Sequence, residues 1–304
     1  MKPNIIHVHR VKEHLLAKLS LTFIKGNSKI VRTVHGRQGV YSDLPILKRI
    51  KSAILGRMEH ILLKYFTDAV IAVSKDLAKC LSGLGLSSNI YQIYNGVNID
   101  KLLNTKYDRV AIRKHFGINQ QIWIGTAARL VKVKDIPMLI IAGKNLQEQG
   151  IPFKISIFGE GPLKESLQTL ISNNKLEEKV MLHGFEPDIL PIIGSLDVFV
   201  LSSQHEGLPM SLLEAMALKI PVICTNVGGM AEIIENGTNG LLVSPSDSRE
   251  LSDAIISIYK TDELASKLVQ NGYTTLEDKY SLSSTGRSLL NIYMKLAATS
   301  KGAI

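Results

Sequence analysis

Two glutamates flank the start of a predicted helix in the segment SSQHEGLPMSLLEAMA, residues 202–217. Pro209 suits the first helical position, where its missing N–H is not needed. The N–H groups of the next three residues would then be free to bind a phosphate. Those residues are Met210, Ser211 and Leu212. Glu206 and Glu214 can accept hydrogen bonds from sugar or ribose hydroxyls. By itself this spacing is more typical of two solvent-facing glutamates.

Further polar and glycine residues follow the neighbouring predicted strands. Arg129 and Lys134, in the segment AARLVKVKD, could neutralise a diphosphate, although a single pair is more often an exposed basic loop. Glycines at other strand ends let backbone approach a ligand closely. They are Gly159, Gly184, Gly228 and Gly229. Ligands of open α/β sheets bind at the carboxyl ends of strands, so these features are expected to converge on one site.

The same residues bear on a reaction in which a sugar is transferred from a nucleotide sugar and the nucleoside diphosphate leaves. Negative charge builds on the leaving diphosphate, and either a metal ion or fixed cations must stabilise it. The sequence contains no Asp-x-Asp pair, and Arg129 and Lys134 can supply the cations. We therefore expect neither a metal nor a cofactor. His7 and His9 share one face of a predicted strand, but no third ligand is evident, and packing is the favoured interpretation.

His35 ends another predicted strand and is followed by Gly36. If the strands are parallel, this histidine faces the cleft between two domains. There it could donate a hydrogen bond or position the sugar or the acceptor. A lone histidine is more often structural, and that alternative stays open.

The elements that must position these residues alternate between β-branched runs and helical stretches. This alternation predicts parallel sheets with helices on both faces. The predicted strands are 5–9, 30–35, 69–73, 90–93, 123–127, 154–158, 180–183, 198–201, 221–224 and 240–243. We expect two doubly wound domains, residues 1–107 and 108–280, followed by a terminal helical segment, 281–304. The first domain has about two βα units fewer than such a domain needs.

Composition and charge suggest the class of partner. The chain has 304 residues, a net charge of +9 and a pI of about 9.4, which favours anionic partners. A basic amphipathic helix is predicted over residues 44–64. It could lie on an anionic membrane, or pack on the core with a solvated basic face. No aromatic-rich or helix-turn-helix pattern indicates nucleic acid. Cys80 and Cys224 have no metal-like spacing and indicate a reducing compartment.

The blocks occur in an order that resembles the retaining glycosyltransferases of family four, also called glycosyl transferases group 1. The blocks are NIIHVH, TVHG, AARLVKVKD, FGEGP, LHGF, SSQHEGLPMSLLEAMA and PVICTNVGGMAEII. The resemblance covers nearly the whole chain. It implies the GT-B fold, in which two Rossmann-like domains face a cleft, and a terminal helix that packs back on the first domain.

The resemblance also implies a role for each matching residue. Arg129 and Lys134 would hold the donor diphosphate, and Glu206 would contact hydroxyls of the donor sugar. Glu214 would bind the ribose, and Gly184 would lie near the base. The remaining matches are His35, which would lie near the transferred sugar, and Met210, Ser211 and Leu212, which would offer N–H groups. The chemistry would retain anomeric configuration without a metal.

The implied reaction is transfer of a hexose or N-acetylhexosamine from a UDP- or GDP-type sugar to a lipid-linked or polysaccharide acceptor. We expect a cytoplasmic protein, peripheral on the inner face of the membrane. The family's glycine-rich first loop has no counterpart at the start of this sequence, which indicates an N-terminally truncated member. The alternative is therefore a non-catalytic sugar-nucleotide-binding remnant. A dinucleotide oxidoreductase is disfavoured because no G-x-G-x-x-G follows a strand.

Overall fold

The computed structural model describes residues 3–24, 27–36, 46–86 and 89–301. The chain divides into two compact units: unit 1 is Met1–Asn95 with Ser283–Ile304, and unit 2 is Gly96–Leu282. The division therefore lies before the expected boundary at residue 107. Residues 96–107 go with unit 2 because Val97 bridges Ser281 and the short helix α4 (Ile99–Leu103) contacts helix α9 (Met210–Ala217).

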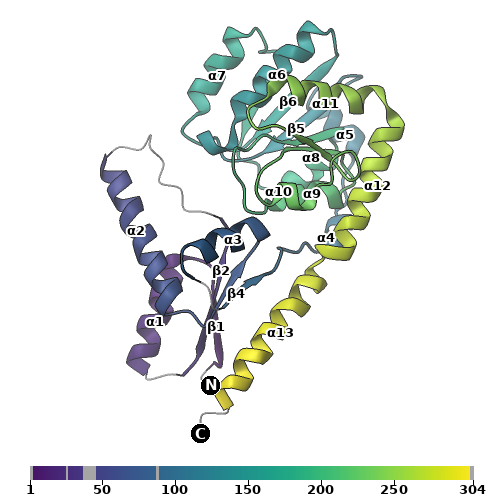
Figure 1. The fold of residues 1–304 in the computed structure, drawn as a ribbon. Coiled ribbons are helices and arrows are strands. Elements are labelled where there is room, and N and C mark those ends of the chain that lie inside the picture. The colour runs from purple at the N-terminus through teal and green to yellow at the C-terminus, as the bar shows by residue number, and fades with distance from the viewer. Residues whose placement is uncertain (1–2, 25–26, 37–45, 87–88, 302–304) are drawn as a thin grey trace. The chain divides into compact units, whose positions relative to one another are not determined.

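Unit 1 is built on a four-stranded parallel sheet in the order β1-β2-β3-β4. Its described elements are β1 (Ile5–Val8), α1 (Val11–Ile24), β2 (Lys29–Val34), α2 (Ile46–Tyr65), β3 (Ala69–Ala72), α3 (Lys75–Gly83), β4 (Ile90–Gln92) and α13 (Leu282–Lys301). Side chains of β2 alternate between the two faces of the sheet. Ile30 packs against α1, and Val31 packs with Ile292 of α13. These two helices lie on opposite sides of the sheet (Figure 1).

Unit 2 is built on a six-stranded parallel sheet in the order β10-β9-β8-β5-β6-β7. Its strands are β5 (Ile122–Ala127), β6 (Phe153–Phe158), β7 (Val180–Gly184), β8 (Val198–Leu201), β9 (Val222–Thr225) and β10 (Leu241–Val243). This is the doubly wound order 3-2-1-4-5-6, which reverses between β5 and β8. Ligands of such sheets bind where the order reverses, outside the carboxyl ends of the strands.

Helices cover both faces of the unit 2 sheet. They are α5 (Arg109–His115), α6 (Ile136–Glu148), α7 (Lys164–Asn173), α8 (Ile189–Ile193), α9, α10 (Met230–Ile233), α11 (Ser248–Lys260) and α12 (Asp262–Lys279). On one face α6, α7 and α11 share a single apolar core with the strands. On the other, α9 packs against α12 and α5 against α8 (Figure 1). Trp123 is fully buried, and its indole N–H donates to Ser156 Oγ at 2.9 Å.

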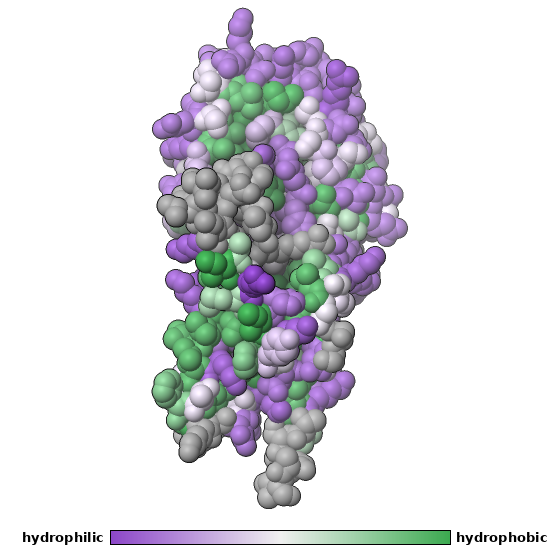
Figure 2. All heavy atoms as spheres, turned by 60° about the vertical axis from the view of Figure 1, so that its left-hand side comes forward, coloured by the Kyte–Doolittle hydropathy of each residue, from purple (hydrophilic) through white to green (hydrophobic). Residues whose placement is uncertain are grey.

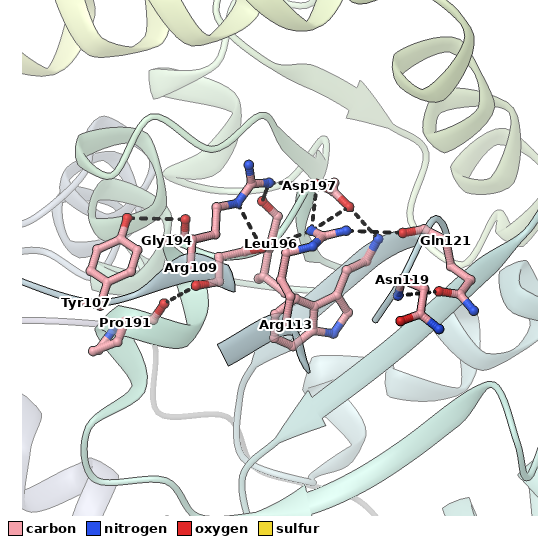
Figure 3. Close-up of polar contacts among 11 residues, drawn as sticks. Tyr107, Arg109, Arg113, Asn119, Gln121, Pro191, Gly194, Leu196 and Asp197 are labelled. Atoms are coloured by element: carbon pink, nitrogen blue, oxygen red, sulfur yellow. Dashed lines mark hydrogen bonds and ion pairs between the residues drawn. The ribbon is translucent and has the colours of Figure 1, made fainter. Parts of the chain in front are cut away.

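A network of charged groups fastens α5 to the amino ends of β5 and β8. The carboxylate of Asp197 accepts from Arg109, from Arg113 and from the backbone N–H of Trp123, at 2.8–3.0 Å (Figure 3). Arg113 also donates to the carbonyl oxygens of Ser195 and Gln121. A cavity of about 550 Å³ lies beside this network. It is at the opposite sheet edge from the strands' carboxyl ends.

The ten strands predicted from sequence are confirmed, each with ends within about one residue of the observed ones. The predicted basic helix forms as α2, but residues 44 and 45 and the side chains of residues 46–50 and 52 lie outside the described part. Neither cysteine forms a disulfide, and burial raises the pKa of the Cys224 thiol to about 12. None of the described helices has the length and hydropathy needed to span a bilayer.

Candidate functional site

The candidate site lies at the carboxyl ends of β5 and β8, where the strand order of unit 2 reverses. The loop after β5 carries Arg129 and Lys134, and the loop after β8 carries Glu206. The Lys134 ammonium forms an ion pair with Oε1 of Glu206, although the residues are 72 positions apart. Both side chains are largely buried, with exposed fractions of 16% and 14%. The sheet topology therefore joins two motifs that the sequence shows only separately.

Backbone and hydroxyl contacts hold these two loops together. Ser202 Oγ donates to the Lys134 carbonyl oxygen at 2.9 Å, and the Gln204 N–H donates to the Val133 carbonyl at 2.8 Å. Ser203 Oγ donates to Glu206 Oε1 at 3.0 Å. Lys134 and Ser203 thus both contact Oε1 of Glu206, and Oε2 has no partner among the described residues. A free carboxylate oxygen remains available to accept a ligand hydroxyl.

Asp135, in the loop after β5, also bonds to the loop after β8 and to Ser246. It adopts a left-handed conformation with φ 44°, which an aspartate tolerates better than most residues. Its Oδ2 accepts from Ser246 Oγ at 2.7 Å and from Gln204 Nε2 at 3.2 Å. Sequence reasoning did not single out Asp135, Ser203 or Gln204. Their partners are distant in sequence, so no local spacing signals them.

Arg129 differs from Lys134 in having no partner among the described residues. Its residue is exposed, and the part of the chain that the structure describes offers its guanidinium no acceptor. The loop after β5 thus offers one guanidinium without an acceptor among the described residues and one ammonium paired with Glu206, and cations of this kind suit an anionic ligand. Lys134 contacts Glu206, in the loop that leads into α9, and the start of that helix offers N–H groups to the same kind of ligand.

The start of α9 differs slightly from the prediction. Pro209 is the residue before the helix, not its first residue, and Met210 begins it. The N–H groups of Met210 and Ser211 find no acceptor among the described residues. The Leu212 N–H donates to the Pro209 carbonyl at 3.2 Å, because the carbonyl of a residue preceding a helix accepts the first bond of the helix. Two of the three expected N–H donors therefore have no acceptor in the described ranges, whereas the Leu212 N–H, which was also expected to be free, is bonded to Pro209.

Glu214 lies one turn into α9 and is half-buried. Desolvation raises the pKa of its carboxyl group. Among the described residues its carboxylate has no hydrogen-bond partner. The described part of the chain thus gives Glu214 none of the donors that normally accompany a half-buried carboxylate, and ligand hydroxyls could supply them.

The glycines at the strand ends serve mainly to bring loops together. A Cβ at Gly159 would lie 2.0 Å from the Ala128 carbonyl oxygen, so this glycine lets the loop after β6 support the Arg129 loop. A Cβ at Gly229 would lie 1.7 Å from the Gly207 carbonyl oxygen, in the Glu206 loop. Gly184 is different: φ is 82° and its Cβ position is open. The lack of a side chain at Gly159 thus permits a close approach to the backbone of Ala128.

His35 lies in unit 1, directly after β2, and is exposed. Its Nε2 is 3.0 Å from Nδ1 of His9. His7 uses both ring nitrogens, with Tyr293 and Thr33, as the packing interpretation of the His7–His9 pair expects. No group of three or more His, Cys, Asp or Glu side chains within the described ranges is arranged to hold a metal ion.

Comparisons with known proteins match both units. The family described as "Glycosyl transferases group 1" matches residues 108–275, and "Glycosyltransferase Family 4" matches residues 1–101. A putative colanic acid biosynthesis glycosyltransferase of Escherichia coli is 35% identical over 181 residues, 56% of this chain and 44% of that protein. An alpha-D-kanosaminyltransferase of Streptomyces kanamyceticus is 29% identical over 64% of this chain and 50% of its own length. The chain spans about half the length of these two relatives.

Other similarities extend over more of the chain. A capsular polysaccharide biosynthesis glycosyltransferase of Staphylococcus aureus is 28% identical over 99% of this chain and 79% of that protein. The crystal structure of Anabaena HepE in complex with UDP and glucose superposes with a TM-score of 0.82 at 21% identity. That match covers 95% of this chain and 77% of the other. At this identity the structural similarity establishes the fold alone.

Proposed function

Because the chain belongs to the glycosyl transferases of group 1 and has the GT-B fold, we propose that it transfers a sugar from a nucleotide-diphosphate donor. The sugar is a hexose or N-acetylhexosamine, and the donor is of the UDP or GDP type. The acceptor is a lipid-linked glycan or a polysaccharide of the cell envelope or capsule. Relatives named for colanic acid, capsule and amylovoran biosynthesis support this acceptor class.

One observation carries the proposal: the Lys134–Glu206 pair lies at the reversal point of the unit 2 sheet, and the loop that carries Lys134 also carries Arg129, which has no partner among the described residues. Lysine has three N–H donors, so Lys134 can contact phosphate oxygens while it stays bonded to Glu206. Arg129 can bind the same diphosphate through its guanidinium. The N–H groups of Met210 and Ser211, for which the described residues offer no acceptor, add hydrogen bonds at the start of α9.

These cations stabilise the charge that builds on the departing diphosphate. We propose that they do so without a metal ion. Glu206 Oε2 accepts from a hydroxyl of the donor sugar, and Glu214 accepts from the ribose. Gly184 lies near the base, where its open Cβ position leaves room. His35 contacts the transferred sugar, which keeps its anomeric configuration.

Unit 1 carries a surface suited to an anionic membrane. Apolar side chains on α1 are exposed at helical spacing, with Leu16 63% and Phe23 85% exposed. Ile54 and Ile61 are exposed on α2, near the exposed cations Arg57 and Lys64. Figure 2 shows these hydrophobic residues gathered on the α1–α2 side of unit 1. We propose that this surface places the protein on the inner face of the membrane, close to a lipid-linked acceptor.

Release of nucleoside diphosphate from UDP- and GDP-sugars, with and without acceptor, tests the reaction. Glu206→Ala and Lys134→Ala should abolish release, whereas Lys164→Ala, on the exposed surface of α7, should leave it unchanged. If both site variants turn over normally, the assignment of the site is wrong. Tight binding of UDP in calorimetry, without turnover of any donor, would instead identify a sugar-nucleotide-binding protein that does not catalyse transfer.

The membrane surface is tested by co-flotation with vesicles. Vesicles that contain an anionic phospholipid should retain the protein, and neutral vesicles should not. Phe23→Ser should weaken retention, because Phe23 has the most exposed large apolar side chain of α1. Equal retention by both vesicle types would contradict the electrostatic part of the proposal.

A further inference from the structure

A cavity of about 230 Å³ lies between helices α2 and α3 of unit 1. The sheet order β1-β2-β3-β4 runs in one direction, so right-handed connections place α1, α2 and α3 on the same face of the sheet. Among the described residues of that face, α2 packs more closely on α1 than on α3. All the residues that line the cavity belong to unit 1, so the cavity is complete within one compact unit.

The cavity is elongated and mostly apolar. Leu77, Leu81 and Leu84 line it from α3 at helical spacing, and Gly56 and Leu63 line it from α2. The lining residues extend over about two turns of each helix, or about 10 Å. Since an apolar cavity of about 150 Å³ can hold benzene, this cavity has room for a short hydrocarbon chain.

Gly56 keeps the cavity open. It lies inside α2 and does not have a positive φ, so its backbone conformation does not require glycine. No heavy atom of the described residues lies within 4 Å of the position that a Cβ would take there, so packing does not require glycine either. Glycine inside a helix is less favourable than alanine. What Gly56 provides is room in the cavity, which a bound group can occupy.

The charges around the cavity suit an anionic head group at one end. Glu59 lines the cavity, but its Oε1 is paired with the buried Arg32 at 3.0 Å, so the carboxylate is compensated. Leu84 is 53% exposed, and the cavity opens to solvent at this end. The Lys64 ammonium lies near the same end, because a Cβ at Gly85 would be 4.0 Å from its Nζ. An apolar cavity with a cation at its mouth matches an anionic amphiphile.

We propose that this cavity binds the hydrocarbon chain of an anionic membrane lipid, whose head group lies beside Lys64. The exposed apolar residues of α1 and α2, which form the proposed membrane surface, belong to the same unit. A lipid chain is therefore the apolar ligand that unit 1 meets at a membrane. The choice of a membrane lipid rests on that proposed surface, whereas the fit of a chain rests on the cavity alone.

Cys80 provides a reporter of the cavity in the full chain. It lines the cavity and is partly exposed, whereas Cys224 is fully buried and burial raises its thiol pKa to about 12. N-Ethylmaleimide should therefore alkylate Cys80 alone, and an unmodified Cys224 verifies that unit 2 stays folded. Octyl phosphate at ten times its Kd should slow this alkylation about tenfold, because only the unoccupied protein reacts.

The affinity for alkyl phosphates, measured by calorimetry, tests what the cavity holds. Each methylene added between butyl and octyl phosphate should tighten binding about fourfold, and inorganic phosphate should not bind there. Gly56→Leu should fill the cavity and abolish binding, whereas Gly83→Leu, at an equally open position of α3 that does not line the cavity, should retain it. Lys64→Gln should weaken octyl phosphate about two- to fivefold and leave the affinity for octanol unchanged.

Vesicles distinguish a membrane lipid from a soluble amphiphile. Vesicles that contain phosphatidylglycerol should slow the alkylation of Cys80, and neutral phosphatidylcholine vesicles should not. Phe23→Ser, outside the cavity on α1, should keep its affinity for octyl phosphate while its retention by vesicles falls.

Three results would overturn the proposal. Affinity that does not rise with chain length would remove the chain from the cavity, as would a Gly56→Leu variant that binds octyl phosphate like the wild type. Protection of Cys80 by octyl phosphate but not by anionic vesicles would overturn the membrane lipid as the ligand. A wild type that turns over no sugar donor would refute the proposed function and leave these binding results standing.

Discussion

The ion pair between Lys134 and Glu206 makes a quantitative prediction about unit 2. Lys134→Met keeps most of the aliphatic stem but leaves Glu206 as a largely buried carboxylate. Removing one partner of a fully buried pair costs about 3–5 kcal/mol. Glu206 is 14% exposed and keeps the hydrogen bond from Ser203, so we expect a smaller loss, about 2–3 kcal/mol.

Substituting the other partner of the ion pair should lower the free energy of unfolding by less. Glu206→Gln leaves the Lys134 ammonium, whose long side chain can reach water, and should cost about 1–2 kcal/mol. In the double variant Lys134→Met/Glu206→Gln no charge remains unpaired. Its loss should fall short of the sum of the two single losses by about 1–2 kcal/mol, as for residues in direct contact.

Urea unfolding followed by tryptophan fluorescence measures these losses. Trp123 is the only tryptophan, is fully buried and lies in β5, so its emission reports on unit 2 rather than on the whole chain. UDP should stabilise the wild type more than Lys134→Met, because a ligand stabilises the state that binds it. Two results would refute the reasoning: a Lys134→Met variant within about 0.5 kcal/mol of the wild type, or strictly additive losses in the double variant.

Four further predictions concern three residues of unit 2 near the same site and one residue of α13. Arg129→Ala should weaken UDP binding in calorimetry by about tenfold or more without changing stability, because the guanidinium is exposed and has no partner among the described residues; unchanged affinity would remove Arg129 from the site. Gly229→Ala should destabilise unit 2 by about 2–3 kcal/mol, since its Cβ would lie 1.7 Å from a backbone oxygen. Gly286→Ala, in α13 with open space around it, should instead stabilise the chain by about 0.5–1 kcal/mol in thermal unfolding. The pKa of Glu214 is raised in the folded state, so its ionisation weakens unit 2 as the pH rises through that pKa. Glu214→Gln should therefore be more stable than the wild type at neutral pH and equal to it near about pH 3, and the opposite trend would contradict the desolvation.

The elements of the fold could be predicted from the sequence because each depends on short-range patterns. The run VFVL at 198–201 is buried on both sides of the sheet, and its short apolar, β-branched pattern is typical of a buried parallel strand. The resemblance to family four, drawn from blocks that follow one another in order, is confirmed by the two family matches. The ends of helices are harder to predict. Pro209 was expected at the first position of α9 and lies one residue before it, and proline is compatible with both positions.

The sequence by itself determined the strands, the helices that alternate with them, the family, and the residue types available at each strand end. Only the tertiary structure decided which of these residues meet. The order β8-β5-β6 brings Lys134 to Glu206 across 72 residues, and the pairing of β1 with β2 brings His9 to His35. It also showed that Gly159 and Gly229 lie close to the backbone of neighbouring loops. The physical reason is that hydropathy patterns act over a few residues, whereas ion pairs and close backbone contacts depend on strand order and register.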